Sequence, residues 1–381
     1  MDWRGVMKIP ARRVAAACAA LMLSIGLAAC GNGAGGGGTS ASASAAGQPA
    51  TLQKAKVKVD SYLSNPPLDI KPLSKTPDNA LRVASVTCTV GSCYPGEFPK
   101  ATQALGWTAS EQTYDLAKGP ADFVAAVRRA LQSRPDALAI LFVYPPDVIA
   151  KEIQQARSQG VKLIDVASAL DAPPQGFIAC VYCNATLKAY GGLMGTYTAV
   201  DAGGPTEVGV VGDKTIDANR ISGKATADEI ARVSPDTKVH TINVSYAQTP
   251  QANTQVVVAT LQRNPGIKYL VFESPDLMGG IDQALSAAGL MGRVKVISTG
   301  PTSGDQTMQV QEGMPYAWIG AEGPAYWWVT ADIMARNAVG DDFNAVPVTA
   351  LRVITEDNAE RDMFAPTDYQ NVFKRAWGVE H

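Results

Sequence analysis

The fold of this chain is decided by residues 135–168, which read PDALAILFVYPPDVIAKEIQQARSQGVKLIDVAS. Residues 137–143 are a short, continuous apolar run, the pattern of a strand that is covered on both faces. Residues 146–158 have the apolar spacing of a helix, Gly160 ends it, and 161–166 are expected to form the next strand. A strand, a helix and a strand joined by short loops predict a βαβ unit in a parallel sheet.

The same alternation extends on both sides of this stretch. It predicts an α/β protein with two similar units, 81–183 and 207–298, each with a doubly wound parallel sheet. The other strands are expected at 81–87, 207–211, 238–244, 268–272, 293–298 and 346–354, and the other helices at 122–132, 187–200, 219–232, 251–263, 277–288 and 327–338. Because ligands bind beyond the carboxyl ends of parallel strands, two facing sheets predict a small-molecule cleft between them.

Composition and charge exclude several classes of function. The 381 residues carry 33 basic and 35 acidic side chains, so the net charge of −2 provides no basic field to hold nucleic acid. The presence of only 2 histidines, far apart, excludes an HExxH-type zinc enzyme. The chain has no GxSxG motif and no P-loop, and its acidic residues form no recognisable acid–base pair. We therefore expect neither an enzyme nor a cofactor.

Residues 1–29 predict an export signal. Basic side chains precede an apolar run at 14–29, which is shorter than the about 20 residues of a membrane span. The run ends in LAACG at 27–31, which resembles a bacterial lipoprotein signal and makes Cys30 the expected lipidation site; an ordinary signal peptide with a chance cysteine is the alternative. Residues 30–50 are mostly Gly, Ser and Ala, as in a flexible tether. We expect an extracytoplasmic protein that is lipid-anchored to the bacterial cell membrane.

Four stretches together resemble the type I periplasmic binding proteins, specifically the sugar-binding-like substrate receptors of ABC importers. They are 135–168, 190–213 (YGGLMGTYTAVDAGGPTEVGVVGD), 264–298 (NPGIKYLVFESPDLMGGIDQALSAAGLMGRVKVIS) and 311–340 (QEGMPYAWIGAEGPAYWWVTADIMARNAVG). The closing residues 368–379 are similar to the tail of some members with lipoprotein signals. The resemblance covers about residues 80–380, and it implies two lobes that are joined by a three-strand hinge and close on a ligand.

The resemblance also implies domain boundaries and partners. After an N-terminal extension at 51–80, lobe 1 is expected at 81–184 plus 323–345 and lobe 2 at 185–322 plus 346–355, with a C-terminal tail at 356–381. The protein would capture a small ligand, a sugar or a sugar-like molecule, and deliver it to ABC permease subunits as a monomer. A ligand-sensing lipoprotein that signals to a membrane receptor is one alternative, and a cysteine-based redox or metal protein is the other.

Candidate ligand contacts in the first lobe follow the predicted strands. Tyr94 and Phe98 follow the first strand, where they stack on a ligand or pack in the core. Ser168 stands where sugar receptors often carry an Asp-Arg pair that clamps hydroxyl groups, and this departure leaves a modified sugar or a less polar ligand open. Asn184 lies where the chain should cross to the second lobe, and Tyr144 is a further candidate.

Candidate contacts in the second lobe begin with Asp213 and Arg220, which follow its first strand. By the resemblance, Arg220 is a bidentate donor to a hydroxyl or carboxylate; a solvated surface arginine is the alternative. Asp276 matches a frequent Asp or Asn of the family, or it caps the helix expected at 277–288. The remaining candidates, near the last strand of this lobe and the third crossover, are Thr302, Glu322 and Trp327.

Four cysteines remain after the signal and the lipidation site. Outside the cytoplasm thiols tend to pair, and we expect disulfides Cys88–Cys93 and Cys180–Cys183. Cross-pairing of the two loops and a zinc site built from all four thiolates stay open. A redox role for Cys180-x-x-Cys183 is not favoured, because such motifs normally sit at a helix start that lowers the thiol pKa, whereas this pair lies in an apolar, strand-like run.

Overall fold

The computed structural model describes residues 50–64, 68–78, 80–320, 323–343, 351–361 and 368–379. The predicted export signal, Cys30, almost all of the predicted tether, and Glu322 lie outside these residues. Of the helices in the described ranges, none has the length and apolar character needed to cross a bilayer.

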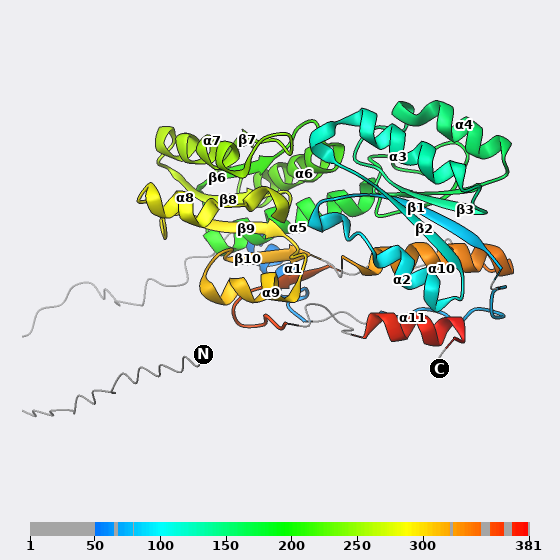
Figure 1. Cartoon of the computed structure of the whole chain (residues 1–381). Coiled ribbons are helices and arrows are strands. Elements are labelled where there is room, and N and C mark those ends of the chain that lie inside the picture. Colours follow the sequence, from blue (N-terminus) through cyan, green and yellow to red (C-terminus); the bar gives the residue numbers. More distant parts are fainter. Residues whose placement is uncertain are drawn as a thin grey trace, which may run out of the picture. The chain divides into compact units, whose positions relative to one another are not determined.

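The first of two sheets has five parallel strands in the order β2-β1-β3-β4-β5. The strands are β1 (Arg82–Cys88), β2 (Thr108–Tyr114), β3 (Ala137–Leu141), β4 (Lys162–Val166) and β5 (Phe177–Val181). Helices α3 (Pro120–Gln132) and α4 (Ala150–Ser158) cover one face of this sheet, and α2 (Glu97–Ala104), α10 (Ala325–Val339) and α11 (Tyr369–Trp377) cover the other (Figure 1). Every residue of β3 is buried, as its continuous apolar sequence predicts. We call this sheet and its helices the first lobe.

The second sheet has six strands in the order β11-β10-β9-β8-β6-β7, and all neighbours are parallel except β10 and β11. The strands are β6 (Glu207–Gly212), β7 (Lys238–Asn243), β8 (Ile267–Phe272), β9 (Lys295–Thr299), β10 (Ala317–Gly320) and β11 (Arg352–Ile354). The helices of this part, which we call the second lobe, are α1 (Ala50–Asp60), α5 (Asn184–Ala202), α6 (Asp217–Val233), α7 (Pro250–Arg263), α8 (Ile281–Ala287) and α9 (Gly304–Met308). Short 3-10 turns are η1 (Gly91–Cys93), η2 (Leu116–Lys118), η3 (Pro146–Ile149), η4 (Pro275–Met278) and η5 (Gln309–Glu312).

The two sheets confirm the predicted fold class, an α/β protein with two lobes built on parallel sheets. The chain leaves the first sheet after β5 and enters the second lobe with α5. It returns to the first lobe with α10 and then adds β11 to the second sheet. Helix α11 of the predicted tail belongs to the first lobe, because the indole rings of Trp328 and Trp377 stack at a centroid distance of 5.6 Å between α10 and α11.

The packing of α5 on α6 depends on two glycines. A Cβ atom at Gly191 would collide with the backbone carbonyl of Ser222, and one at Gly195 would collide with that of Thr226. By contrast, a Cβ at Gly192 would meet nothing within 4 Å. The apolar sequence of α5 therefore combines with two small residues on one side to bring the helix backbones close together.

One predicted helix, 277–288, is wrong in its boundaries. The structure divides it into η4 and α8, because Gly279 and Gly280 interrupt the helix and Gly280 adopts the left-handed conformation with φ of 77°. Asp276 therefore lies inside η4, and the Ser274 hydroxyl accepts the hydrogen bond from the Asp276 N–H at 3.3 Å. The prediction that Asp276 caps a helix is corrected accordingly: Ser274 is the capping residue.

Candidate functional site

A cavity of about 140 Å³ lies between the two lobes. It is lined by residues at the carboxyl ends of both sheets, including Cys88 of β1, Ala167 after β4, Glu273 after β8 and Thr299 of β9. This is where ligands bind in open parallel sheets, and it is the position that the strand order predicts. Most of the cavity lining is apolar, and among the described residues that form it none is Lys, Arg or His.

A larger cavity, of about 670 Å³, lies at the opposite edge of the first sheet. Its lining includes Arg82, Asp136 and Lys162, which stand at or just before the amino ends of β1, β3 and β4. Parallel α/β sheets bind their ligands at the other edge. We therefore place the candidate site in the smaller cavity between the lobes.

Tyrosines form the aromatic part of the cavity lining. The ring of Tyr182 lies 5.3 Å from that of Tyr190 and 5.8 Å from that of Tyr326, measured between centroids. Tyr182 adopts φ of 64°, a conformation that is rare for a bulky residue, in the short loop between β5 and α5. Tyr246, after β7, lines the cavity from the second lobe.

Glu273 is the acidic residue that lines the cavity, and it follows β8 directly. Only 5% of it is exposed, its Oε1 accepts a hydrogen bond from the Thr226 hydroxyl at 3.1 Å, and its buried Oε2 has no partner among the described residues. Burial raises the pKa of Glu273 to about 8, against the opposing effect of the Ser222 and Thr226 hydroxyls. At neutral pH the side chain is therefore mainly a neutral carboxylic acid that can donate a hydrogen bond.

Two contacts join the loops of the lobes beside the cavity. Asp276 Oδ2 accepts hydrogen bonds from the hydroxyl of Ser92 and, at 3.3 Å, from its backbone N–H. The hydroxyl of Tyr94 donates to the carbonyl of Pro301 at 3.2 Å, and its ring would collide with a Cβ at Gly323. Tyr94 and Asp276, both predicted as ligand contacts, thus connect the two lobes directly.

Two predicted contacts of the first lobe are in the core. Phe98 and Trp327 are both 0% exposed, and their rings pack edge to face at a centroid distance of 5.7 Å. The indole N–H of Trp327 donates to the Cys93 carbonyl at 3.0 Å. Neither residue lines the cavity, so the prediction that Phe98 and Trp327 contact the ligand is wrong. Phe98 packs in the core, as the alternative stated, and Trp327 packs beside it.

Other predicted contacts are engaged in local structure. Asp213 Oδ1 accepts from the Thr215 N–H at 2.9 Å and its Oδ2 from the Tyr246 N–H at 3.0 Å, so it fixes two loops. Arg220 forms an ion pair with Asp217 at 2.5 Å and its side chain is 57% exposed, as in the surface alternative. Asp213 and Arg220 also line a separate cavity, of about 320 Å³, on the second lobe.

The remaining candidates are likewise held by neighbours. The Asn184 amide donates to Asp171 at 2.5 Å, and Thr302 donates from both its hydroxyl and its backbone N–H to Gln306. The Tyr144 hydroxyl lies 3.5 Å from the Leu116 carbonyl, and Ser168 donates to Asp165. The last predicted contact, Glu322, lies outside the described residues.

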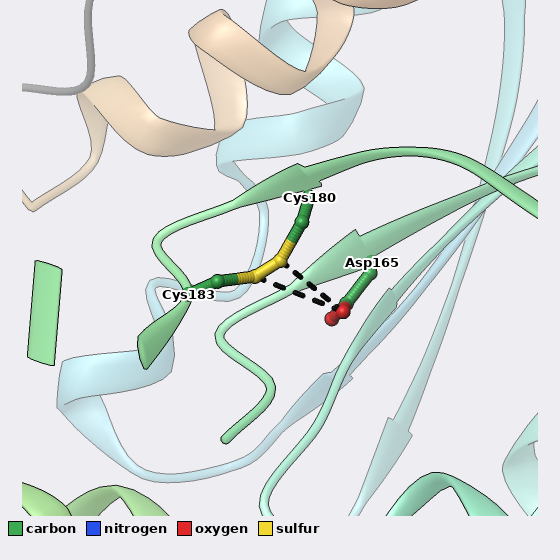
Figure 2. Close-up of side chains that lie close together, drawn as sticks. All are labelled: Asp165, Cys180 and Cys183. Atoms are coloured by element: carbon green, nitrogen blue, oxygen red, sulfur yellow. Dashed lines mark hydrogen bonds between the residues drawn. A yellow bond between two sulfur atoms is a disulfide. The ribbon is translucent and has the colours of Figure 1, made fainter. Parts of the chain in front are cut away.

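The described cysteines form the two predicted disulfides. Cys88 pairs with Cys93 at a Cα separation of 5.5 Å, and Cys180 pairs with Cys183 at 6.0 Å. Figure 2 shows the second disulfide with the Asp165 carboxyl directed at its sulfur atoms. The structure therefore has neither the cross-pairing nor the four-thiolate arrangement.

Comparison with known proteins identifies both a family and a fold. A model of the family described as periplasmic binding protein domain matches residues 97–342. The 5-methylthioribose transporter solute binding protein from Thermotoga lettingae, in complex with 5-methylthioribose, is similar with a TM-score of 0.63 and 19% identity, over 75% of this chain and 89% of that chain. No curated protein sequence matches the chain.

Two further solved structures are similar over nearly their whole length. An ABC transporter periplasmic solute binding protein from Actinobacillus succinogenes with bound D-allose gives a TM-score of 0.62 and 16% identity, over 73% of this chain and 99% of that chain. An ABC transporter solute binding protein from Mycobacterium smegmatis with bound glycerol gives 0.61 and 19%, over 76% of this chain and 98% of that chain. At these identities the similarity establishes a common fold.

Proposed function

Because this chain belongs to the periplasmic binding protein domain family, we propose that it is an extracytoplasmic lipoprotein that captures one small solute between its lobes and delivers it to an ABC importer. The observation that carries this proposal is the cavity of about 140 Å³, which residues from both lobes line at the carboxyl ends of their sheets. A ligand bound there contacts both lobes at once, and its binding energy therefore favours the closed arrangement.

The ligand we propose is a sugar or a sugar-like molecule with an apolar face. An engineered apolar cavity of about 150 Å³ binds benzene, so this cavity suits a ligand of about one six-membered ring. Tyr182, Tyr190 and Tyr246 offer apolar ring surfaces, while Glu273 offers a buried hydrogen-bonding group. The absence of a cationic side chain among the described lining residues disfavours an anionic ligand. The relatives named above were crystallised with 5-methylthioribose, D-allose and glycerol, which are small and uncharged.

The membrane anchor is part of the proposal. The sequence LAACG at 27–31 supports cleavage before Cys30 and attachment of lipid to its sulfur, and the Gly/Ser/Ala-rich residues 30–50 would then tether the lobes. The lobe boundaries we propose are 81–184 plus 323–345, with α11 packed on this lobe, and 185–322 plus 346–355, with α1 packed on this lobe. The partners would be the ligand, the permease subunits and the membrane, and the protein would bind the ligand as a monomer, without converting it as an enzyme would.

A thermal-shift screen tests the binding function. The purified protein is heated with 5-methylthioribose, D-allose and a library of neutral and charged small solutes. A ligand at about 100 times its dissociation constant stabilises by about 2.7 kcal/mol and should raise the melting temperature clearly. Glu273→Gln should weaken binding of that ligand, whereas Glu312→Gln, at an exposed position, should not. If no solute in the library shifts melting, or if both variants bind as well as wild type, the cavity is not the site.

Uptake and fractionation test the importer and the anchor. Cells that make the protein should accumulate the labelled ligand faster than cells that lack it, and Cys30→Ser should release the protein from the membrane fraction. If the ligand changes gene expression while uptake stays the same, the sensory alternative is the better description. If Cys30→Ser leaves the protein in the membrane fraction, the lipid anchor is refuted.

A further inference from the structure

The position of the Cys180–Cys183 disulfide differs from the sequence prediction in one decisive respect. Cys180 lies in β5, but Cys183 is the N-cap residue of α5, a helix of 19 residues. No acidic residue lies in the first turn of that helix. Redox-active motifs of this spacing normally sit at a helix start, so the argument that this pair lies away from one no longer holds.

A second, independent observation is the buried carboxyl beside the disulfide. Asp165 is 0% exposed, and its Oδ2 lies 3.2 Å from Sγ of Cys180 and 3.7 Å from Sγ of Cys183 (Figure 2). The group accepts hydrogen bonds from the hydroxyl and the backbone N–H of Ser168. Burial nevertheless raises the pKa of Asp165 to about 7, because these two hydrogen bonds oppose the effect of burial only in part. A carboxyl with this pKa can give and take a proton near neutral pH.

The disulfide is also accessible from outside. Cys180 and Cys183 are partly exposed and line a cavity of about 340 Å³. The other disulfide is enclosed, because Cys88 is 0% and Cys93 4% exposed. Reducible disulfides are the exposed ones, whereas structural disulfides resist reduction. The described residues therefore hold one partly exposed disulfide beside a proton donor and one disulfide that is buried.

We propose that Cys180–Cys183 is a thiol–disulfide exchange site, at which an external dithiol reduces the pair and Asp165 supplies the proton. A thiolate of the dithiol attacks Sγ of Cys183 and forms a mixed disulfide. The bond to Sγ of Cys180 breaks, and the Cys180 thiolate takes the proton of the Asp165 carboxyl. This carboxyl lies nearer to Sγ of Cys180 than to Sγ of Cys183. The second thiol of the reductant loses its proton to solvent and attacks the sulfur atom of the reductant in the mixed disulfide. The reductant leaves as a disulfide, and Cys183 is released as a thiolate at the start of α5.

The electrons and protons balance in this sequence. The protein disulfide gains two electrons, and the dithiol loses them as its own disulfide forms. The Cys183 thiolate and the ionised Asp165 carboxylate later take up protons from solvent. In the reverse direction, the Cys183 thiolate attacks an oxidising disulfide, and Asp165 removes the proton from the Cys180 thiol.

The test follows reduction of each disulfide in the intact, folded protein. The oxidised protein is incubated with dithiothreitol, samples are quenched by alkylation, and mass spectrometry reports the modified cysteines against time. We expect Cys180 and Cys183 to become modified while Cys88 and Cys93 stay protected. Simultaneous reduction of both pairs, or reduction only after unfolding, would refute an exchange site.

The role of Asp165 is tested with a matched pair of carboxyl variants. Asp165→Asn should slow reduction about a hundredfold, the usual contribution of a general acid. Asp171→Asn changes a carboxyl that lines the same cavity but is 80% exposed, and it should leave the rate nearly unchanged. Equal rates for Asp165→Asn and wild type would remove Asp165 from the mechanism.

A measurement on the wild-type protein covers the case in which Asp165→Asn does not fold. The rate of reduction, divided by the thiolate fraction of dithiothreitol, should fall as pH rises through about 7, because Asp165 then loses its proton. A flat profile between pH 5 and 9 would refute the proposed proton transfer. Ser168→Ala removes a hydrogen bond to the ionised carboxylate and should move the fall to higher pH.

Discussion

We expect Glu273→Gln to change how the stability of the protein depends on pH. Glu273 keeps its proton in the folded protein up to about pH 8, whereas in the unfolded chain it releases the proton near its ordinary pKa of 4.5. The folded state therefore binds more protons between these two values. The stability that Glu273 contributes is fully present below about pH 4.5 and is lost as pH rises through about 8. Glutamine has nearly the same shape and does not titrate, so this loss disappears in the variant.

The size of the effect follows from the raised pKa. A rise in pKa from 4.5 to about 8 corresponds to about 5 kcal/mol of unfolding free energy, at about 1.4 kcal/mol for each pKa unit. This value is the upper limit for how much ionisation of Glu273 destabilises the wild type at high pH. At pH 5 wild type and variant should differ little. At pH 9 the variant should be the more stable protein, by on the order of 3 kcal/mol.

Urea denaturation at pH 5, 7 and 9, followed by tryptophan fluorescence, measures this difference. Glu312→Gln, at an exposed position, is the control and should follow the wild type at every pH. Asp165 is present in all three proteins, so its own titration cancels in the comparison. If Glu273→Gln and wild type keep the same difference in stability from pH 5 to 9, the carboxyl is ionised in the folded protein and the reasoning is wrong.

Three other predictions concern packing and closure. Gly191→Ala should destabilise the protein, because the methyl group collides with the backbone of α6, whereas Gly192→Ala should be neutral or slightly stabilising; urea midpoints of both variants decide this. Trp377→Ala should cost about 3–5 kcal/mol, since it removes a fully buried ring, and an unchanged urea midpoint would contradict the packing of α11. Asp276→Ala should weaken ligand binding and shift scattering toward a more open form by removing the contact with Ser92; unchanged affinity and scattering would show that this contact does not hold the lobes.

The parts of the fold that were predictable from sequence are those whose pattern is set by burial. The continuous apolar run at 137–143 predicts β3, because strands covered on both faces tolerate few polar residues, and the strand expected at 161–166 corresponds to β4. The edge strand β2 (TASEQTY) was not expected, since it is largely half-buried and mixes polar and apolar residues. The glycine pair at 279–280 could have indicated the break between η4 and α8.

The candidate site was less predictable, because the sequence does not show which residues from distant parts of the chain a side chain contacts. Asp276 was placed at the correct edge of the second sheet, but its contact with Ser92 depends on how the lobes meet. Glu273 was missed, although an acidic residue directly after a buried strand could have indicated it. The position of Cys183 at the start of a helix was not expected, because the apolar run of β5 hides the start of α5.

The packing of α1 determines which half of the molecule is joined to the residues that precede Ala50. Leu52 and Ala55 of α1 pack in one apolar cluster with residues of α5 and α6, and Lys58 pairs with Glu229 at 3.5 Å. The chain that precedes Ala50 therefore emerges from the six-stranded half. If that chain ends in a lipid, the tether joins the six-stranded half, and the five-stranded half is linked to the membrane only through it. Closure on a ligand would then change the position of the five-stranded half relative to the tethered half, and a permease could distinguish the two states by that change.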